Sequence, residues 1–177
     1  MRIIGGERRG TKIGAPRGHE TRPTSDRARE AAFNLIGPVE GATVLDLFAG
    51  SGAYGLEALS RGADSAVFAE SDLAACASIR ENLAKLRFTG ATVLCRDAIQ
   101  VLAEEAAAGR RYDLVLVDPP YRMFSDVQTG LTTYLPHVLS EDGLAVVETH
   151  AKEEPELPLT LRTSRRYGSA RLTLFER

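Results

Sequence analysis

The sequence contains no tryptophan, and its 177 residues include only two cysteines and three histidines. Two cysteines provide no disulfide framework, and no CxxC pair indicates a zinc site. No apolar stretch approaches the roughly 20 residues that a membrane helix requires. The first ten residues, MRIIGGERRG, lack the apolar core of a signal peptide. We therefore expect a cytoplasmic protein that binds no metal and does not enter a membrane.

Several kinds of catalysis lack the residues that they require. Cys76 lies in an apolar helical stripe and Cys95 lies in VLCRD, so both are interpreted as small core residues and not as nucleophiles. The three histidines, His19, His137 and His150, have no metal-binding spacing, and nothing resembles a Ser-His-Asp set. A cytosine-C5 methyltransferase, a zinc enzyme and a serine hydrolase are therefore not expected.

The net charge of −2 conceals an uneven distribution. Residues 1–29 carry eight basic and three acidic side chains, whereas the rest of the chain carries 14 basic and 21 acidic ones. A basic arm on an acidic body is typical of a protein that binds a polyanion at one end, although a solvated tail fits the charge equally well. We expect residues 1–22 to form a basic N-terminal hairpin and loop, and residues 23–177 to form the main domain.

From residue 43 onward, strand patterns alternate with helix patterns, which predicts an α/β fold with a doubly wound, mostly parallel sheet. Ligands of such sheets bind outside the carboxyl ends of the strands. A small hairpin is predicted from residues 2–4 and 11–13, and a first helix is predicted to start with Thr24 as its cap. The later strands are predicted at 44–48, 65–70, 92–95, 114–117, 143–149, 159–164 and 170–176, and the later helices at 53–60, after Ser71 or Asp72, at 98–108 and between 126 and 139.

The segment TVLDLFAGSGAYGLEAL, residues 43–59, places glycines directly after a strand. Gly50, Gly52 and Gly55 fit the G-x-G-x-x-G pattern, which serves NAD, FAD or S-adenosylmethionine. Asp46 favours a cationic group such as the amino group of a methionine moiety, and it disfavours phosphates. Its alternative role is to cap backbone N–H groups of the neighbouring turn.

Two further carboxylates follow the next two strands. Glu70 could hold ribose hydroxyls of any of these cofactors, so it does not discriminate between them. Asp97 could accept a hydrogen bond from an adenine amino group, could cap the next helix, or could do both.

The tetrad DPPY, Asp118 to Tyr121, is the most specific signal in the sequence. Two consecutive prolines make the backbone stiff and remove two N–H donors, which leaves the Asp118 carboxylate and the Pro119 carbonyl as fixed acceptors. Such acceptors suit the exocyclic amino group of a nucleobase, whose nitrogen can then attack a sulfonium methyl group. Tyr121 would stack on the base, an interaction worth roughly 1–3 kcal/mol.

At these residues the chain resembles a known family. LDLFAGSGAYGLEALSRGA together with DPPY resembles the class I S-adenosylmethionine-dependent methyltransferases that act on exocyclic amines. MRIIGG, RPTSDRAREAAFN and FAGSGAYGLEALSRGA together resemble one branch, the RsmD-type small-subunit (16S) rRNA guanine-N2 methyltransferases. The resemblance covers nearly the whole chain.

The resemblance implies a Rossmann-like seven-stranded methyltransferase sheet with a reversed last hairpin and an N-terminal β-hairpin that contacts RNA. It implies S-adenosylmethionine as cofactor, and as substrate a guanine in small-subunit rRNA (guanine 966 in the family) within an assembling 30S particle. The family often has an aromatic residue where Arg8 stands, which leaves the RNA contact of the hairpin open. The implied residues are Asp118, Pro119 and Tyr121 for catalysis; Asp46, Phe48, Gly50, Ser51, Gly52, Glu70, Ser71, Asp97 and Ala98 for the cofactor; and Arg2, Arg8, Arg9, Lys12 and Arg22 for RNA.

Other functions remain open at this point. DPPY also fits a DNA adenine-N6 or cytosine-N4 methyltransferase, although the compact chain has no evident target-recognition domain. The glycine pattern fits an NAD-dependent oxidoreductase, and an RNA-binding assembly factor without catalysis is a further alternative. No heptad or evident interface is present, so we expect a monomer.

Overall fold

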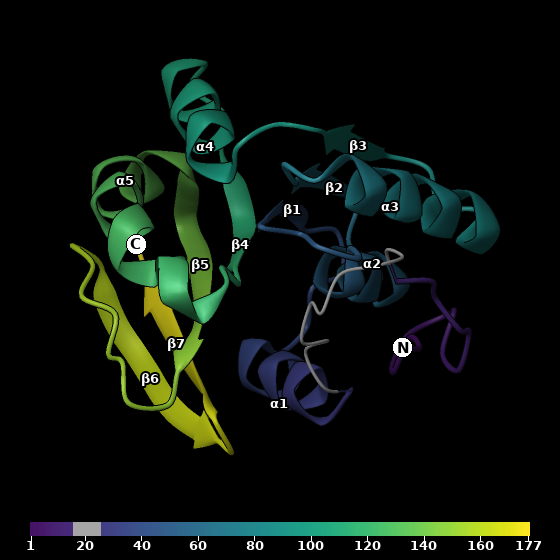
Figure 1. The fold of residues 1–177 in the computed structure, drawn as a ribbon, viewed down its shortest axis with the longest axis horizontal. Coiled ribbons are helices and arrows are strands. Elements are labelled where there is room, and N and C mark those ends of the chain that lie inside the picture. Colours follow the sequence, from purple (N-terminus) through teal and green to yellow (C-terminus); the bar gives the residue numbers. More distant parts are fainter. Residues whose placement is uncertain (16–25) are drawn as a thin grey trace.

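In the computed structural model, the alternating strands and helices form one central sheet with helices on both faces (Figure 1). The structure describes residues 1–15 and 26–177. The strands are β1 (Thr43–Leu47), β2 (Ser65–Ala69), β3 (Ala91–Leu94), β4 (Tyr112–Val117), β5 (Leu139–His150), β6 (Thr160–Tyr167) and β7 (Ala170–Glu176). The helices are α1 (Asp26–Ile36), α2 (Ala53–Ser60), α3 (Leu73–Leu86), α4 (Ala98–Ala107) and α5 (Phe124–Val138), and a short 3₁₀ turn, η1 (Tyr121–Met123), follows β4.

The strand order across the sheet is β3-β2-β1-β4-β5-β7-β6. Strand β7 runs antiparallel to its neighbours β5 and β6, whereas the other neighbouring strands are parallel. This confirms the predicted doubly wound sheet of seven strands with a reversed last hairpin. The chain leaves β1 toward β2 and later returns to β4 on the other side of β1, so the switch point where ligands bind lies between β1 and β4.

Successive residues of β1 face two separate cores. Val44 packs in a core with Phe33 of α1 and Ile79 of α3, whereas Leu45 packs in a second core with Leu102 of α4 and Leu131 of α5. All six side chains are almost completely buried. Because helices cover both faces, the central strands are apolar at nearly every position, apart from the buried carboxylate described below.

Most predicted elements are confirmed, with shifted ends. Helix α2 has the predicted bounds, whereas β5 begins at Leu139 and not at residue 143. The four residues before 144, SEDG, resemble a turn because glycine and aspartate are rare in strands. Pairing of Leu139 with Tyr112 of β4 nevertheless extends the strand, with an irregularity in register between Tyr112 and Leu114.

The predicted N-terminal hairpin is not formed by two paired strands. Residues 1–15 contain one isolated antiparallel bridge, between Arg2 and Lys12. Ile3 donates to the Thr11 carbonyl at 2.9 Å, but the next two N–H groups, of Ile4 and Gly5, donate to the buried Glu57 carboxylate of α2 at 2.8 and 2.7 Å, so the pairing does not extend beyond the bridge. This N-terminal segment is therefore a bridged loop that packs on the helices, as its position beside α2 and α3 in Figure 1 shows.

Some expectations concern residues outside the described ranges. The predicted cap Thr24, the RNA candidate Arg22 and the division between residues 22 and 23 all lie in 16–25, which the structure does not describe. Among the described helices, none is long and apolar enough to span a bilayer.

Candidate active site

The glycine loop turns sharply between β1 and α2. Phe48, Gly50 and Gly52 all have positive φ, at 60°, 55° and 78°. A β-carbon added to Gly55 would come within 2.3 Å of the Phe68 ring, so only glycine allows α2 to pack this closely on β2. Phe48 adopts its left-handed conformation without being glycine, and such strained positions concentrate at functional sites. The loop is thus a tight backbone turn at the carboxyl end of β1.

Asp46 lies beneath this loop and is only 1% exposed. Its Oδ2 accepts a hydrogen bond from the Gly55 N–H at 2.9 Å. Burial raises the pKa of Asp46 to about 7; the Glu70 carboxylate also raises it, and the Gly55 N–H opposes the shift. The structure therefore realises the capping role that the sequence left as an alternative, and the anchoring of a cofactor amino group stays a prediction.

Glu70 joins the glycine loop to the turn after β2. Its two carboxylate oxygens accept from the N–H groups of Gly50 and Asp72, both at 2.8 Å. Asp72 is the N-cap of α3, where it accepts from the Ala75 N–H at 2.8 Å. Of the two predicted caps, the structure selects Asp72, while Ser71 is exposed on the turn between the two carboxylates.

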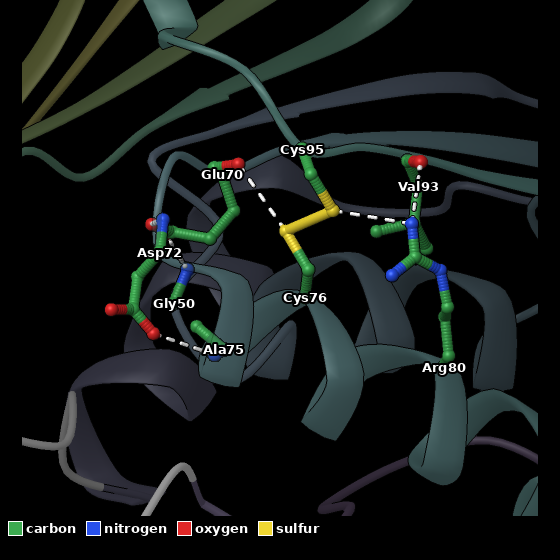
Figure 2. Close-up of a disulfide and its surroundings, with 8 residues drawn as sticks. All are labelled: Gly50, Glu70, Asp72, Ala75, Cys76, Arg80, Val93 and Cys95. Atoms are coloured by element: carbon green, nitrogen blue, oxygen red, sulfur yellow. Dashed lines mark hydrogen bonds between the residues drawn. A yellow bond between two sulfur atoms is a disulfide. The ribbon is translucent and has the colours of Figure 1, made fainter.

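A disulfide joins Cys76 of α3 to Cys95, which directly follows β3, with Cα atoms 6.0 Å apart (Figure 2). Cys76 is a fully buried core residue, as expected, and Cys95 is half-buried, but the expectation of no disulfide was wrong. The two residues are 19 positions apart, and only the packing of α3 on β3 brings them together. Cys76 Sγ lies 3.3 Å from the Glu70 carbonyl oxygen, and Arg80 donates to Cys95 Sγ at 3.1 Å. The disulfide thus links α3, which follows Glu70, to the segment after β3 that leads to Asp97.

Asp97 caps α4, and its Oδ1 accepts from the N–H groups of Ile99 and Gln100, at 3.0 and 2.9 Å. This confirms the capping alternative, while contact with adenine stays a prediction. Ala98 begins α4 and is buried, so its backbone and not its side chain lies at this edge.

The DPPY tetrad lies at the same edge, directly after β4. The Asp118 N–H is 3.5 Å from the Leu47 carbonyl oxygen at the end of β1, so the tetrad starts beside the glycine loop. Pro119 is buried, whereas Asp118 and Tyr121 are half-buried. Tyr121 opens the turn η1, in which the Met123 N–H donates to the Pro120 carbonyl at 2.7 Å. The structure therefore brings the cofactor candidates and the catalytic candidates together.

Sequence reasoning missed Glu148 and His150, which contact Tyr121, and Tyr54, which contacts Glu148. Glu148 Oε2 accepts from the Tyr54 hydroxyl at 2.9 Å, and Glu148 Oε1 lies 3.4 Å from the Tyr121 hydroxyl. The ring of His150 packs edge-on against Tyr121, with centroids 5.6 Å apart. Burial, followed by the charges of Glu148 and Asp118, raises the pKa of Tyr54, so its hydroxyl stays protonated and donates.

A signal for Glu148 was present in the sequence, because it is a carboxylate in the apolar strand segment GLAVVET. A charged residue in a buried strand requires a partner, but the identity of that partner depends on the fold. Tyr54 lies in the glycine-loop segment and fits the apolar pattern of a helix, so nothing in the sequence indicated its hydrogen bond to Glu148.

The RNA candidates of the N-terminal segment lie apart from this edge. Helices α2 and α3 start at the carboxyl edge of the sheet and end at the opposite edge. Arg8 lies at those far ends, since its N–H donates to Ser60 Oγ at 3.0 Å and its Nε donates to the Leu86 carbonyl at 2.9 Å. Arg9 neighbours it in the same exposed turn. Arg2 pairs with Asp26 at 3.2 Å, and Lys12 is exposed beside it in the bridge.

The residues of the carboxyl edge form a series that follows the strand order. Asp97 follows β3, Glu70 follows β2, the glycine loop follows β1, Asp118 follows β4 and Glu148 lies at the end of β5. Adjacent strands are about 4.8 Å apart, so Asp97 and the loop are separated by about 10 Å, the extent of a nucleoside. The acidic groups fit ribose and adenine donors. Gly50, where an added β-carbon would meet no atom closer than 4.0 Å, fits a chain passing over it. A nucleoside cofactor with a cationic tail therefore fits, with the tail toward β4.

Comparison with known proteins identifies similar chains. A family model described as conserved hypothetical protein 95 matches residues 1–176. The ribosomal RNA small subunit methyltransferase D of Escherichia coli K12 is 40% identical over 158 residues, which cover 89% of this chain and 75% of that protein. The putative rRNA methyltransferase YlbH of Bacillus subtilis 168 is 39% identical over 91% of this chain and 88% of its own length.

Solved structures agree with this similarity. The putative methyltransferase yhhF from Escherichia coli superposes with a TM-score of 0.84 at 36% identity, covering 100% of this chain and 97% of the other. A hypothetical protein of Thermus thermophilus superposes with a TM-score of 0.85 at 34% identity, covering 100% and 99%. A putative methyltransferase complexed with SAH shares the fold, with a TM-score of 0.71 at 16% identity, covering 85% and 48%.

Proposed function

Because this chain belongs to the conserved hypothetical protein 95 family, together with the ribosomal RNA small subunit methyltransferase D proteins, we propose that it methylates the N2 amine of a guanine in small-subunit rRNA. The chain is an S-adenosylmethionine-dependent methyltransferase of this family. The choice of a single guanine, guanine 966 in the family, and an assembling 30S particle as substrate are part of the proposal.

The observation that carries the proposal is the position of DPPY beside the glycine loop, on the neighbouring strand of the same sheet edge. A base presented to Asp118 would meet the cationic end of a cofactor held by Glu70 and the loop. The stiff Asp118-Pro119 backbone supports acceptance of both N–H groups of an exocyclic amine, which leaves the nitrogen lone pair directed toward the cofactor.

S-adenosylmethionine supplies the reaction with a methyl group on a positively charged sulfur. When bound, it would give this methyl group to the guanine N2 and leave as the neutral thioether, and the nitrogen would lose one proton, for which the Asp118 carboxylate is the proposed acceptor. Asp118 and Pro119 orient the amine, and Tyr121, held by Glu148 and His150, supports the plane of the base. Positioning and electrostatics carry this catalysis, without a covalent enzyme intermediate.

Nucleoside mass spectrometry of rRNA from a strain that lacks the gene tests the proposal. We expect one N2-methylguanosine to disappear from small-subunit rRNA, and the wild-type gene to restore it. A plasmid carrying Asp118→Ala should not restore it. If the modified nucleosides of small-subunit rRNA are unchanged in the deletion strain, the proposed substrate is wrong.

A further inference from the structure

A second basic segment lies at the C-terminal end of the chain. Residues 160–177 carry five arginines and one glutamate, whereas residues 30–159 carry nine basic and 20 acidic side chains. The acidic body is therefore flanked by basic residues at both of its ends, and the C-terminal group belongs to the hairpin of β6 and β7.

Strand pairing places the end of this hairpin at the edge of the sheet that holds the candidate active site. Glu148 of β5 pairs with Leu172 of β7, and Leu172 pairs with Arg165 of β6. Paired residues share one face of a sheet, so Arg165 lies on the face that Glu148 occupies, about 10 Å away across two strand spacings. In Figure 1 the end of the β6–β7 hairpin projects beyond the end of β5. Arg165 thus lies on the rim of the proposed guanine site.

The contacts of this end leave positive charge facing solvent. Glu154 pairs closely with Arg171, at 2.7 Å, and lies 4.0 Å from Arg166. Within the described residues, the one hydrogen bond of the Arg165 guanidinium is to the Ser164 carbonyl, at 3.4 Å. Arg165 is exposed, whereas Arg166, the next residue of β6, points to the opposite face of the sheet, which it shares with Arg171. Glu154 is therefore engaged by the arginines of the opposite face and does not neutralise Arg165.

The N-terminal turn cannot supply this charge at the same place. Arg8 and Arg9 lie at the far end of α2, eight residues and about 12 Å along the helix from the glycine loop. Arg8 also rests over the Phe88 ring, 5.8 Å from its centroid, and donates to a backbone carbonyl. The end of the β6–β7 hairpin lies at the carboxyl edge of the sheet, where Asp118 lies, whereas that turn lies at the opposite edge.

We infer that Arg165, at the end of the β6–β7 hairpin, is an rRNA-contacting residue that binds a phosphate of the nucleotides flanking the methylated guanine. The inference rests on the proposed function, because it takes the rRNA as the partner. Arginine suits this partner, since its planar guanidinium can donate two parallel hydrogen bonds to a phosphate. This contact positions the strand across the end of β5 and carries no sequence information of its own.

Arg165→Ala tests the inference against Arg111→Ala as a matched control. Arg111 is also exposed, donates within the described residues to the carbonyl of its preceding residue, also at 3.4 Å, and precedes β4 at the opposite edge of the sheet. We would measure binding of a 16S rRNA transcript, and of small-subunit particles from the deletion strain, between 50 and 300 mM salt. Each lost phosphate contact should reduce the slope of log affinity against log salt by about 0.7.

We expect Arg165→Ala to weaken RNA binding about threefold to tenfold with a shallower salt slope, and Arg165→Glu to weaken it further. Arg111→Ala should match the wild-type protein in both measurements. Equal affinity and slope for Arg165→Ala and Arg111→Ala, on transcript and particle alike, would overturn the inference. Transfer of labelled methyl groups by the wild-type protein to the same RNA reports separately on the proposed function, so the two can fail independently.

Discussion

The Tyr54 hydroxyl donates to Glu148 Oε2 at 2.9 Å and so connects the first turn of the helix after the glycine loop to the end of β5. Glu148 is 6% exposed, and its second oxygen faces the Tyr121 hydroxyl. One buried carboxylate therefore holds a residue from the proposed cofactor side and a residue from the proposed base side. This arrangement makes Glu148 a positioning residue for Tyr121.

Glu148→Gln should lower kcat/KM for rRNA about tenfold to a hundredfold, because an amide has one acceptor oxygen for two tyrosine donors. The affinity for S-adenosylmethionine should change less than twofold. Glu141→Gln, an exposed carboxylate at the other end of the same strand, is the control. Steady-state kinetics with calorimetric cofactor binding checks both quantities; equal losses in cofactor affinity and rRNA turnover would indicate a general structural role.

Asp118→Asn should reduce methyl transfer by at least a hundredfold while leaving cofactor binding within a factor of two or three. The amide replaces one acceptor oxygen with an N–H donor that faces the amine of the base. Asp126→Asn, an exposed aspartate in the first turn of α5, is the matched control. Incorporation of labelled methyl groups into rRNA measures the effect, and near wild-type turnover by Asp118→Asn would contradict the role assigned to this carboxylate.

The raised pKa of Asp46 makes stability depend on pH. Asp46 is protonated in the folded protein up to about pH 7, whereas an unfolded aspartate ionises near 3.8. Between pH 3.8 and pH 7, unfolding therefore releases a proton from Asp46. The stability that this residue contributes to the folded protein is fully present below pH 3.8 and is lost as the pH rises to about 7. The loss is on the order of 4 kcal/mol at most.

Asp46→Asn removes this dependence, since its amide oxygen can still accept from Gly55 but does not titrate. Urea unfolding at pH 5, 6, 7 and 8 should show a smaller decline of the unfolding free energy in Asp46→Asn than in the wild type. Asp142→Asn, an exposed substitution, should retain the wild-type decline. Parallel pH profiles of Asp46→Asn and the wild type would show that the buried carboxyl does not titrate in this range.

The Cys76–Cys95 disulfide should stabilise the packing of α3 on β3, next to Glu70. A bridge closing a loop of about this length contributes about 3 kcal/mol, so dithiothreitol should lower the unfolding free energy of the wild type by about 2–3 kcal/mol. The Cys76→Ser/Cys95→Ser double variant should unfold identically with and without the reductant. Non-reducing peptide mapping identifies the bridge, and recovery of both cysteines as free thiols from the native protein would contradict it.

Local signals in the sequence predicted much of the fold and part of the site. The turn of the glycine loop, the cap at Asp97 and the stiff Asp118-Pro119 segment depend on neighbours within a few residues, so they could be inferred without knowing the fold. The start of β5 could not be inferred in this way, because SEDG is typical of a turn and only pairing with β4 makes this segment part of the strand.

The sequence by itself determined the alternation of strands and helices, the glycine turn and the acceptors of DPPY, because periodicity, φ preference and missing N–H groups act over short distances. Only the tertiary structure decided the contacts between distant residues. Tyr54 meets Glu148 across 94 positions, Glu57 captures the backbone of Ile4, and Arg165 comes to the rim of the site through two strand pairings. Such contacts arise from the packing of whole elements, which leaves no periodic pattern in the sequence around either partner.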